Sequence, residues 1–182
     1  MYDKTILNNR GAELAASGDY EGAEKTFHQA LAASPGDPLV CYNIGYTLLK
    51  KGKKPEAVRW FDNAVIFAGR ARHGWDGELA LDCGLACYEA ALYEEAEKFY
   101  QAAGVTGLES GEYFNRFGVL YFVTERYTDA LSFFEKAVAA DPDHPDAWFN
   151  LADTCDVLGF EEKALAARTE FLRLEKKKGT QK

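Results

Sequence analysis

The sequence has few residues of the kinds that interrupt helices or cross-link small folds. Its 182 residues include five prolines, four cysteines and one methionine. Four cysteines are too few to hold a chain of this length together through disulfides, and no pair has the two-residue gap of zinc or redox motifs. A reducing compartment is favoured, so we expect a cytoplasmic protein. A leader or lipoprotein segment removed during maturation would leave the same residues.

Long apolar runs and an excess of positive charge are also missing. The longest apolar runs have five residues, 64–68 and 119–123, far below the roughly 20 that a membrane span needs. The 29 acidic residues exceed the 21 basic ones, which gives a net charge of −8 and repels phosphate backbones. Hydrophobic residues make up 47% of the chain, which excludes a disordered tail. We expect a soluble globular domain with no membrane span and no affinity for nucleic acid.

Motifs for catalysis or metal binding are absent from the sequence. It contains no phosphate-binding loop and no nucleophile elbow. The three histidines are scattered, and His144 between two prolines is expected to cap a helix. Cys83 and Cys87 would share a helix face, so a thiol or metal site there remains a minor alternative to four core cysteines. We expect no enzyme, no cofactor and no metal.

An internal repeat of 34 residues organises the chain. Four sets of residues recur in one phase: Ala23, Ala57, Ala96, Ala130 and Ala164; Gly11, Gly45, Gly84 and Gly118; Phe27, Phe61, Tyr100 and Phe134; and Ala30, Ala64, Ala103 and Ala137. The repeat predicts one domain over residues 1–182 with units 4–37, 38–71, 77–110, 111–144 and 145–178 and an insertion at 72–76.

Each unit is predicted to contain two helices. Apolar residues recur three and four positions apart over about a dozen residues, with glycine or proline between these stretches. A glycine inside a helix costs about 1 kcal/mol relative to alanine, so its repetition needs a packing reason. We expect each glycine on a first helix to face an alanine on the second, so that the two backbones approach closely.

This pattern resembles the tetratricopeptide repeat. The fourth unit matches it best, through Phe114, Phe117, Gly118, Tyr121, Ala130, Phe134, Ala137 and Pro142. The resemblance implies an all-α, right-handed α-solenoid of antiparallel helix pairs, with about five units, whose first helices line a concave groove that binds proteins. Some family members clamp a C-terminal carboxylate with lysines, asparagines and an arginine on three first helices. This chain lacks that set, so binding of that kind is disfavoured.

In units two to four the groove face of the first helices is largely apolar and aromatic where a merely solvated face would be polar, and in units one and five it is more polar. On a helical wheel, Cys41, Ile44 and Leu48 point to the second helix. The other face carries the candidate protein-binding residues: Asn9, Tyr42, Asn43, Tyr46, Leu49, Asp82, Leu85, Tyr88, Arg116, Phe122, Phe149, Asn150 and Asp153. Leu81, Val119 and Val123 lie on the same predicted face. Burial against a neighbouring repeat would explain single members, but a partner explains the set better.

Asparagine recurs at one groove position, at Asn9, Asn43 and Asn150, with Asp82 and Arg116 as counterparts. An amide both donates and accepts, so it can bind the main chain of an extended peptide. The alternative is that these amides bridge adjacent first helices, and that Asp82 pairs with Arg116.

Two further segments differ from the repeat. In the long junction 69–77, Arg70, Arg72, His73 and Trp75 would either close over one edge of the groove or form a tolerated surface insertion. In the last unit, Arg168 replaces the core aromatic residue. A terminal repeat must present a polar face, so Arg168 is expected to cap the solenoid.

We therefore predict a non-enzymatic module that binds a protein segment or helix in its groove, as adaptor, assembly factor or chaperone. Acidic residues border the apolar face at Glu78, Asp82, Glu112, Asp146 and Asp153. The expected partner is a protein or peptide with apolar anchors and basic flanks. The alternative is a self-associating scaffold, a homo-oligomer whose groove binds a neighbouring copy.

Overall fold

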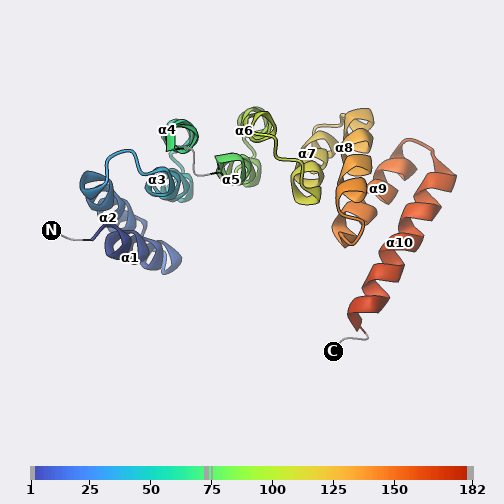
Figure 1. Ribbon diagram of the computed structural model, residues 1–182, viewed down its shortest axis with the longest axis horizontal. Helices are drawn as coiled ribbons and strands as arrows, with labels where there is room; N and C mark the ends of the chain where they lie inside the picture. Colours follow the sequence, from blue (N-terminus) through green and yellow to red (C-terminus); the bar gives the residue numbers. More distant parts are fainter. Residues whose placement is uncertain (1–2, 72–73, 75, 180–182) are drawn as a thin grey trace. The chain divides into compact units, whose positions relative to one another are not determined.

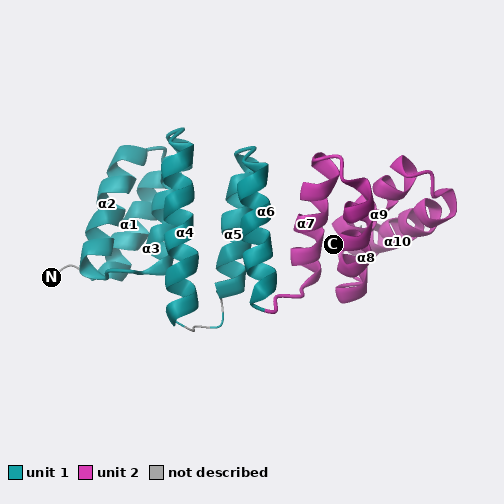
Figure 2. Cartoon of the chain, turned by 90° about the horizontal axis from the view of Figure 1, so that it is seen from above, with its two compact units in different colours: residues 1–106 teal, residues 107–182 magenta. Residues whose placement is uncertain are grey.

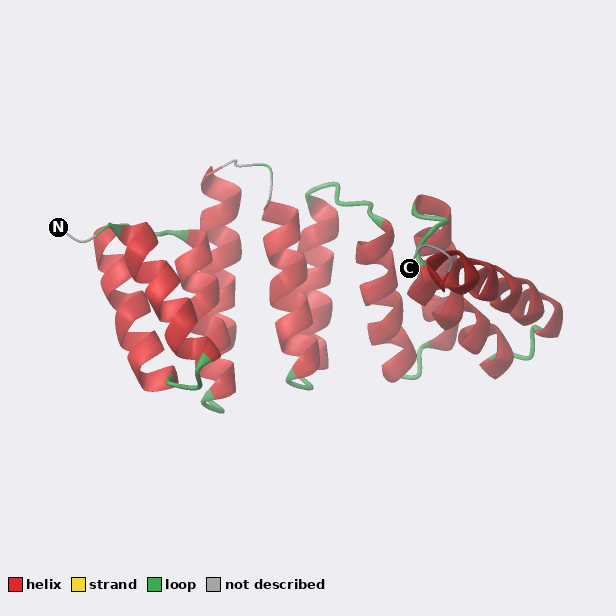
Figure 3. Cartoon of the chain, turned by 90° about the horizontal axis from the view of Figure 1, so that it is seen from below, coloured by secondary structure: helices red, strands yellow, loops and turns green. Residues whose placement is uncertain are grey.

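The structure is a computed structural model that describes residues 3–71, 74 and 76–179. These residues form helices joined by turns and contain no strand (Figures 1 and 3). The helices are α1 (Lys4–Ala16), α2 (Tyr20–Ala33), α3 (Pro38–Lys50), α4 (Lys54–Ala71), α5 (Asp76–Glu89), α6 (Tyr93–Val105), α7 (Gly111–Val123), α8 (Tyr127–Ala140), α9 (Pro145–Val157) and α10 (Glu161–Gly179).

Consecutive helices pack as antiparallel pairs, α1 with α2 through to α9 with α10. The chain divides into two compact units, which Figure 2 colours separately: unit 1 (residues 1–106) holds three pairs and unit 2 (residues 107–182) holds two. Four of the five pairs begin at the first residue of a predicted repeat, and the third begins one residue early, at Asp76. A single domain over residues 1–182 stays a prediction.

Side-chain caps and left-handed turns delimit the helices. Asp37 Oδ1 accepts from the N–H groups of Leu39 and Val40 at 3.1 and 3.2 Å, and Pro38 occupies the first turn of α3, where a missing N–H costs nothing. The turn inside each pair has a residue with positive φ at one repeat position: Gly18, Gly52, Ala91, Glu125 and Gly159. Glycine takes this conformation without strain, so Ala91 and Glu125 are the two strained turns.

The core of each of the first four pairs is a glycine packed under an aromatic ring. A Cβ added at Gly118 would lie 2.6 Å from Cε1 of Phe134, and one at Gly45 would lie 2.7 Å from the ring of Phe61. In the second and third pairs the glycine also faces the repeat alanine, as expected: an added Cβ would lie 3.1 Å from the carbonyl oxygen of Ala57 at Gly45 and 3.3 Å from that of Ala96 at Gly84. The ring fills the space beside the glycine, because without a Cβ the first helix leaves room for a whole aromatic edge.

The four cysteines are buried in this core, as predicted. Burial raises the pKa of the Cys41 thiol to about 11 and that of Cys87 to about 12. Neutral thiols with such pKa values behave as small apolar side chains.

The first residues of the long junction after the second repeat are helical. Helix α4 continues through Gly69 and Arg70 to Ala71, so it has 18 residues where α2 has 14. The Arg70 guanidinium lies 5.9 Å from the centre of the Phe67 ring. Arg72, His73 and Trp75 lie outside the described residues.

Candidate functional site

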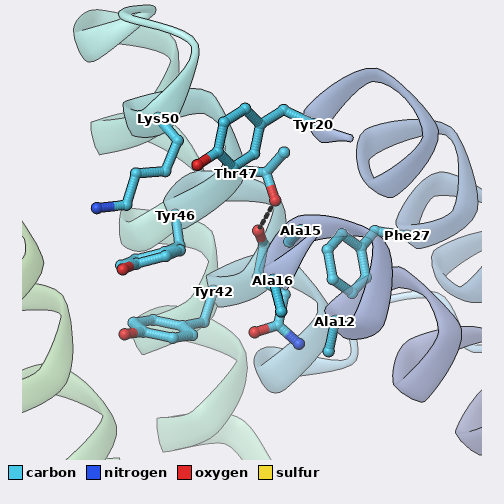
Figure 4. A pocket seen from close by; sticks show the side chains of 10 residues that line it. Ala12, Ala15, Ala16, Tyr20, Phe27, Tyr42, Tyr46, Thr47 and Lys50 are labelled. Carbon is cyan, nitrogen blue, oxygen red and sulfur yellow. Dashed lines mark hydrogen bonds between the residues drawn. The ribbon is translucent and has the colours of Figure 1, made fainter. Parts of the chain in front are cut away.

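In unit 1, the two faces of the first helix α3 differ as the helical wheel predicts. Cys41, Ile44 and Leu48 are at most 1% exposed. Tyr42 and Tyr46, on the opposite face, are half-buried. Their rings stack with centroids 6.3 Å apart, and Figure 4 shows both hydroxyl groups pointing the same way. The groove face of α3 is thus a preformed aromatic wall.

A hollow of about 420 Å³ lies between α1 and this wall (Figure 4). Three alanines of α1 form one side, and side chains of α2 and α3 form the others. Its lining residues are Ala12, Ala15, Ala16, Tyr20, Phe27, Tyr42, Asn43, Tyr46, Thr47 and Lys50. The Thr47 hydroxyl donates to the carbonyl of Asn43 at 2.7 Å, so this polar group is satisfied within the helix. The hollow therefore presents mainly apolar and aromatic surface, as ligand pockets do.

One cation stands at the rim of the hollow. The Lys50 ammonium lies 4.9 Å from the centre of the Tyr46 ring. A hydrogen bond with the Tyr46 hydroxyl raises the pKa of Lys50. Burial, with a smaller contribution from Asp82, raises the pKa of Tyr42. Tyr42 therefore offers a neutral hydroxyl group near pH 7, and Lys50 offers a positive charge.

Helix α5 supplies further half-buried apolar side chains in unit 1. Leu85 and Tyr88 are half-buried, and the Tyr88 ring lies 5.9 Å from that of Tyr93 on α6. Asp82 is exposed. Leu81, which the wheel places on the groove face, is 6% exposed and belongs to the core.

Two of the asparagines join adjacent first helices, one pair in each unit. Asn43 on α3 donates to Asn8 on α1 at 2.8 Å, and Asn150 on α9 donates to Asn115 on α7 at 2.9 Å. These bridges support the alternative that the amides are structural. Asn9 is exposed and lies one residue from the bridge. A bond between Asp82 and Arg116 would join the two units, whose relative placement the structure leaves undescribed.

Unit 2 exposes aromatic side chains on its own first helices. Phe122 is half-buried, 5.3 Å from the Tyr127 ring, and Phe149 is 47% exposed, 5.4 Å from the Phe171 ring. Asp153 is half-buried on α9. These residues remain candidates for partner contacts.

Glu112, one of the acidic border residues, already has side-chain partners. It pairs with Arg116, and its Oε2 lies 3.0 Å from Nε2 of His144. Burial opposes ionisation of Glu112, but these two hydrogen bonds outweigh it and lower the pKa of the carboxyl. Nδ1 of His144 accepts from the Ala147 N–H at 3.4 Å. His144 is therefore the helix cap that the sequence predicts. The charge of the Glu112 carboxylate is already compensated by Arg116, so it attracts a basic partner only weakly.

Comparison with protein families accounts for this architecture. A model of the tetratricopeptide repeat matches residues 14–68 and 124–167, together more than half of the chain. The chain belongs to the tetratricopeptide repeat (TPR) family. The helix pairs, the 34-residue period and the glycine–aromatic cores are thus TPR features, and the family resemblance inferred from the sequence is confirmed.

Two curated relatives are similar to part of this TPR chain. The cell division cycle protein 16 homologs of Homo sapiens and Mus musculus are each 24% identical over 133 residues, which cover 70% of this chain and 21% of the relative. The chain therefore spans about a fifth of the length of the curated relatives it matches.

Solved structures of MamA share the fold. The MamA 41-end structure from Desulfovibrio magneticus RS-1 has a TM-score of 0.74 at 20% identity and covers 97% of this chain and 98% of that one. The structure described as the MamA RS-1 ArsTM double mutant has a TM-score of 0.76 at 20% identity and covers 99% of both chains. At these identities the likeness shows the TPR fold alone, and it confirms the all-α prediction.

Two searches of the described TPR residues found nothing further. No helix in residues 3–71 and 76–179 is long and apolar enough to cross a bilayer. Among the same residues, no three histidine, cysteine or carboxylate side chains gather as metal ligands would.

Several walls of the hollow were missed from the sequence: Ala15, Ala16, Tyr20 and Thr47. A signal was present for two of them. In the second repeat, Leu49 and Lys50 occupy the positions of Ala15 and Ala16. The smaller side chains on α1 predict a space between α1 and the next first helix, α3. Tyr20 and Thr47 gave no such signal, because they lie on other faces of their helices.

Proposed function

We propose that this TPR protein is a non-enzymatic interaction module that binds a segment of a partner protein at the hollow between α1 and α3. One observation carries the proposal: the hollow joins apolar walls to a few polar groups on rigid helices. Aromatic side chains in such settings supply most of the binding energy of protein interfaces. Adaptor, assembly factor or chaperone is the role proposed.

The proposed occupant is an apolar side chain of the partner. Tyr42 and Tyr46 would contact its faces, while Ala12 and the other alanines of α1 leave the room for it. Leu49, Leu85, Tyr88, Phe122, Phe149 and Asp153 remain proposed contacts for neighbouring parts of the segment.

The flanks of the segment are proposed to be basic. Asp82 is exposed and close enough to Tyr42 to raise the pKa of its hydroxyl. Asp146 is exposed and Asp153 half-buried on α9. The positive charge of Lys50 repels basic residues beside the hollow. We therefore propose that the basic residues of the segment lie away from its apolar anchor. We place the protein in a reducing compartment, because all four cysteines are free and buried.

The test is selection from a displayed library of random peptides on the full chain. Enriched peptides should carry a bulky apolar anchor, and their affinity should fall by about 1–3 kcal/mol in Tyr46→Ala. The control is His28→Ala. His28 is an exposed aromatic side chain on α2 outside the hollow, so this variant should bind as wild type does.

Enrichment that is equal on wild type and Tyr46→Ala would refute the hollow as the site. Enriched peptides that are acidic on both flanks would refute the basic-flank preference while leaving the hollow itself in place. A groove that binds a neighbouring copy would instead show as self-association that Tyr46→Ala abolishes.

A further inference from the structure

The outer face of α1 exposes an apolar side chain at a position that is buried in later pairs. Ile6 is 63% exposed. Its counterparts in later repeats, Val40, Leu79 and Ala147, are at most 4% exposed. Leu14, two turns further along α1, is half-buried on the same face. The first helix thus has a helix-packing face without the helix that covers it elsewhere.

The later pairs show what covers this face. The second helix of one pair packs on the first helix of the next: α2 on α3, α4 on α5 and α8 on α9. Helix α1 begins the described chain, and its contacts are with α2 and α3 (Figure 2). Ile6, Arg10 and Leu14 line an open hollow of about 510 Å³ there. The element that covers this face in the later pairs is therefore the second helix of a repeat.

Helix α10 is a second helix whose outward face is equally exposed. Leu165 and Leu172 are 66% and 52% exposed. Their counterparts on α8, Leu131 and Val138, are half-buried where α8 packs against α9. Helix α10 thus exposes the kind of second-helix face that covers first helices in the later pairs.

We infer that the outer face of α10 binds the outer face of α1 of a second copy of this chain, in the packing that α2 makes on α3. In that packing Lys51, at the end of α3, contacts Glu21 and Glu24 near the start of α2 at 2.7 and 2.5 Å. The two helices are therefore antiparallel. Transferred to the junction, this register places Leu14 on Leu165 and Ile6 on Leu172.

Charge complementarity selects a copy of this chain as the occupant. Phe27 of α2 and Thr47 of α3 both line the hollow between α1 and α3. Their counterparts at the junction are Arg168 of one copy and Glu13 of the other, which carry opposite charges. Arg168, the expected cap, is exposed and bound to Asp156 of its own chain, and Glu13 is exposed. The transferred register thus gives two apolar contacts and brings side chains of opposite charge, Arg168 and Glu13, to the same junction.

The junction uses two different surfaces, so it is a heterologous contact. Each added copy brings one α10 face and one α1 face, so the association is not limited to a dimer. Both faces lie outside the hollow of the proposed binding site, so the two proposals stand or fall separately.

Sedimentation of the full chain over a concentration series up to about 1 mM, the range of weak small interfaces, tests this junction. The mean wild-type mass should rise with concentration above that of the monomer. Ile6→Asp and Leu172→Asp should each remain monomeric, because each blocks one end. An equimolar mixture of the two variants should form dimers, since the intact α10 face of the first binds the intact α1 face of the second.

Two controls complete the experiment. Ile66→Asp, at a 49%-exposed apolar side chain on α4, should assemble as wild type does. Glu13→Arg and Arg168→Glu should each weaken association roughly threefold or more, and their combination in one chain should restore it. Helicity measured by circular dichroism confirms that each variant is folded. A wild type that stays monomeric, a mixture that stays monomeric, or a loss of assembly in Ile66→Asp would overturn the inference.

Discussion

The glycine under an aromatic ring makes the sharpest prediction about stability. Gly118→Ala adds one methyl group in the middle of α7. That Cβ would lie 2.6, 2.7 and 3.0 Å from three carbons of the Phe134 ring. The ring is 1% exposed, so it has no free space to move into. The substitution therefore forces a shift of the helix pair.

Two effects of opposite sign determine the magnitude. Alanine favours a helix interior over glycine by about 1 kcal/mol. Overpacking a filled core costs about 1–3 kcal/mol, and contacts below 3.0 Å with an immobile ring place Gly118→Ala near the upper end. The net loss is about 1–2 kcal/mol, which lowers the melting temperature of a chain of this size by roughly 2–8 °C.

Gly69→Ala is the matched control. Gly69 also lies inside a helix, α4, but no atom lies within 4 Å of an added Cβ. The same substitution there should raise the melting temperature slightly, because only helix propensity changes. In a Phe134→Leu background the penalty at Gly118 should shrink, with a coupling of about 1–2 kcal/mol. A Gly118→Ala variant as stable as wild type would refute the packing account of the glycine repeat.

Three further substitutions test separate parts of the fold. Asn150→Ala removes the donor to the nearly buried Asn115, so denaturant unfolding should show a loss of about 1–3 kcal/mol, whereas Asn9→Ala should change stability by less than about 0.5 kcal/mol. Ala91→Gly should gain about 0.5 kcal/mol in the same assay, since glycine relieves the strain of φ 56° but orders at greater entropic cost. Burial raises the pKa of the Cys87 thiol from 9.0 to about 12. Between these pH values the folded state binds more protons than the unfolded state, so the free energy of unfolding falls as the pH rises above 9. Cys87→Ala should flatten that loss, and a slope equal to that of wild type would contradict the burial of the thiol.

The sequence by itself determined the repeat, the helix pairs and the faces of the first helices. These features follow from local rules: apolar spacing of three and four residues, glycine and proline at the turns, and two alanines and one aromatic residue per period. Tyr42 and Tyr46 could be assigned to the open face because a helix of known phase leaves only one face uncovered. The resemblance to the tetratricopeptide repeat then predicted an all-α solenoid of antiparallel helix pairs.

The tertiary structure decided what depends on the tilt and offset between neighbouring helices. The asparagine bridges join residues 35 apart, Asn8 to Asn43 and Asn115 to Asn150, although the period is 34. Likewise the contact of each first-helix glycine with an aromatic ring depends on how the two helices are offset, and the hollow takes walls from three helices. A period along the chain states which positions are equivalent. The position that each one contacts across the gap is set by how side chains of different volume fill the space between two helices.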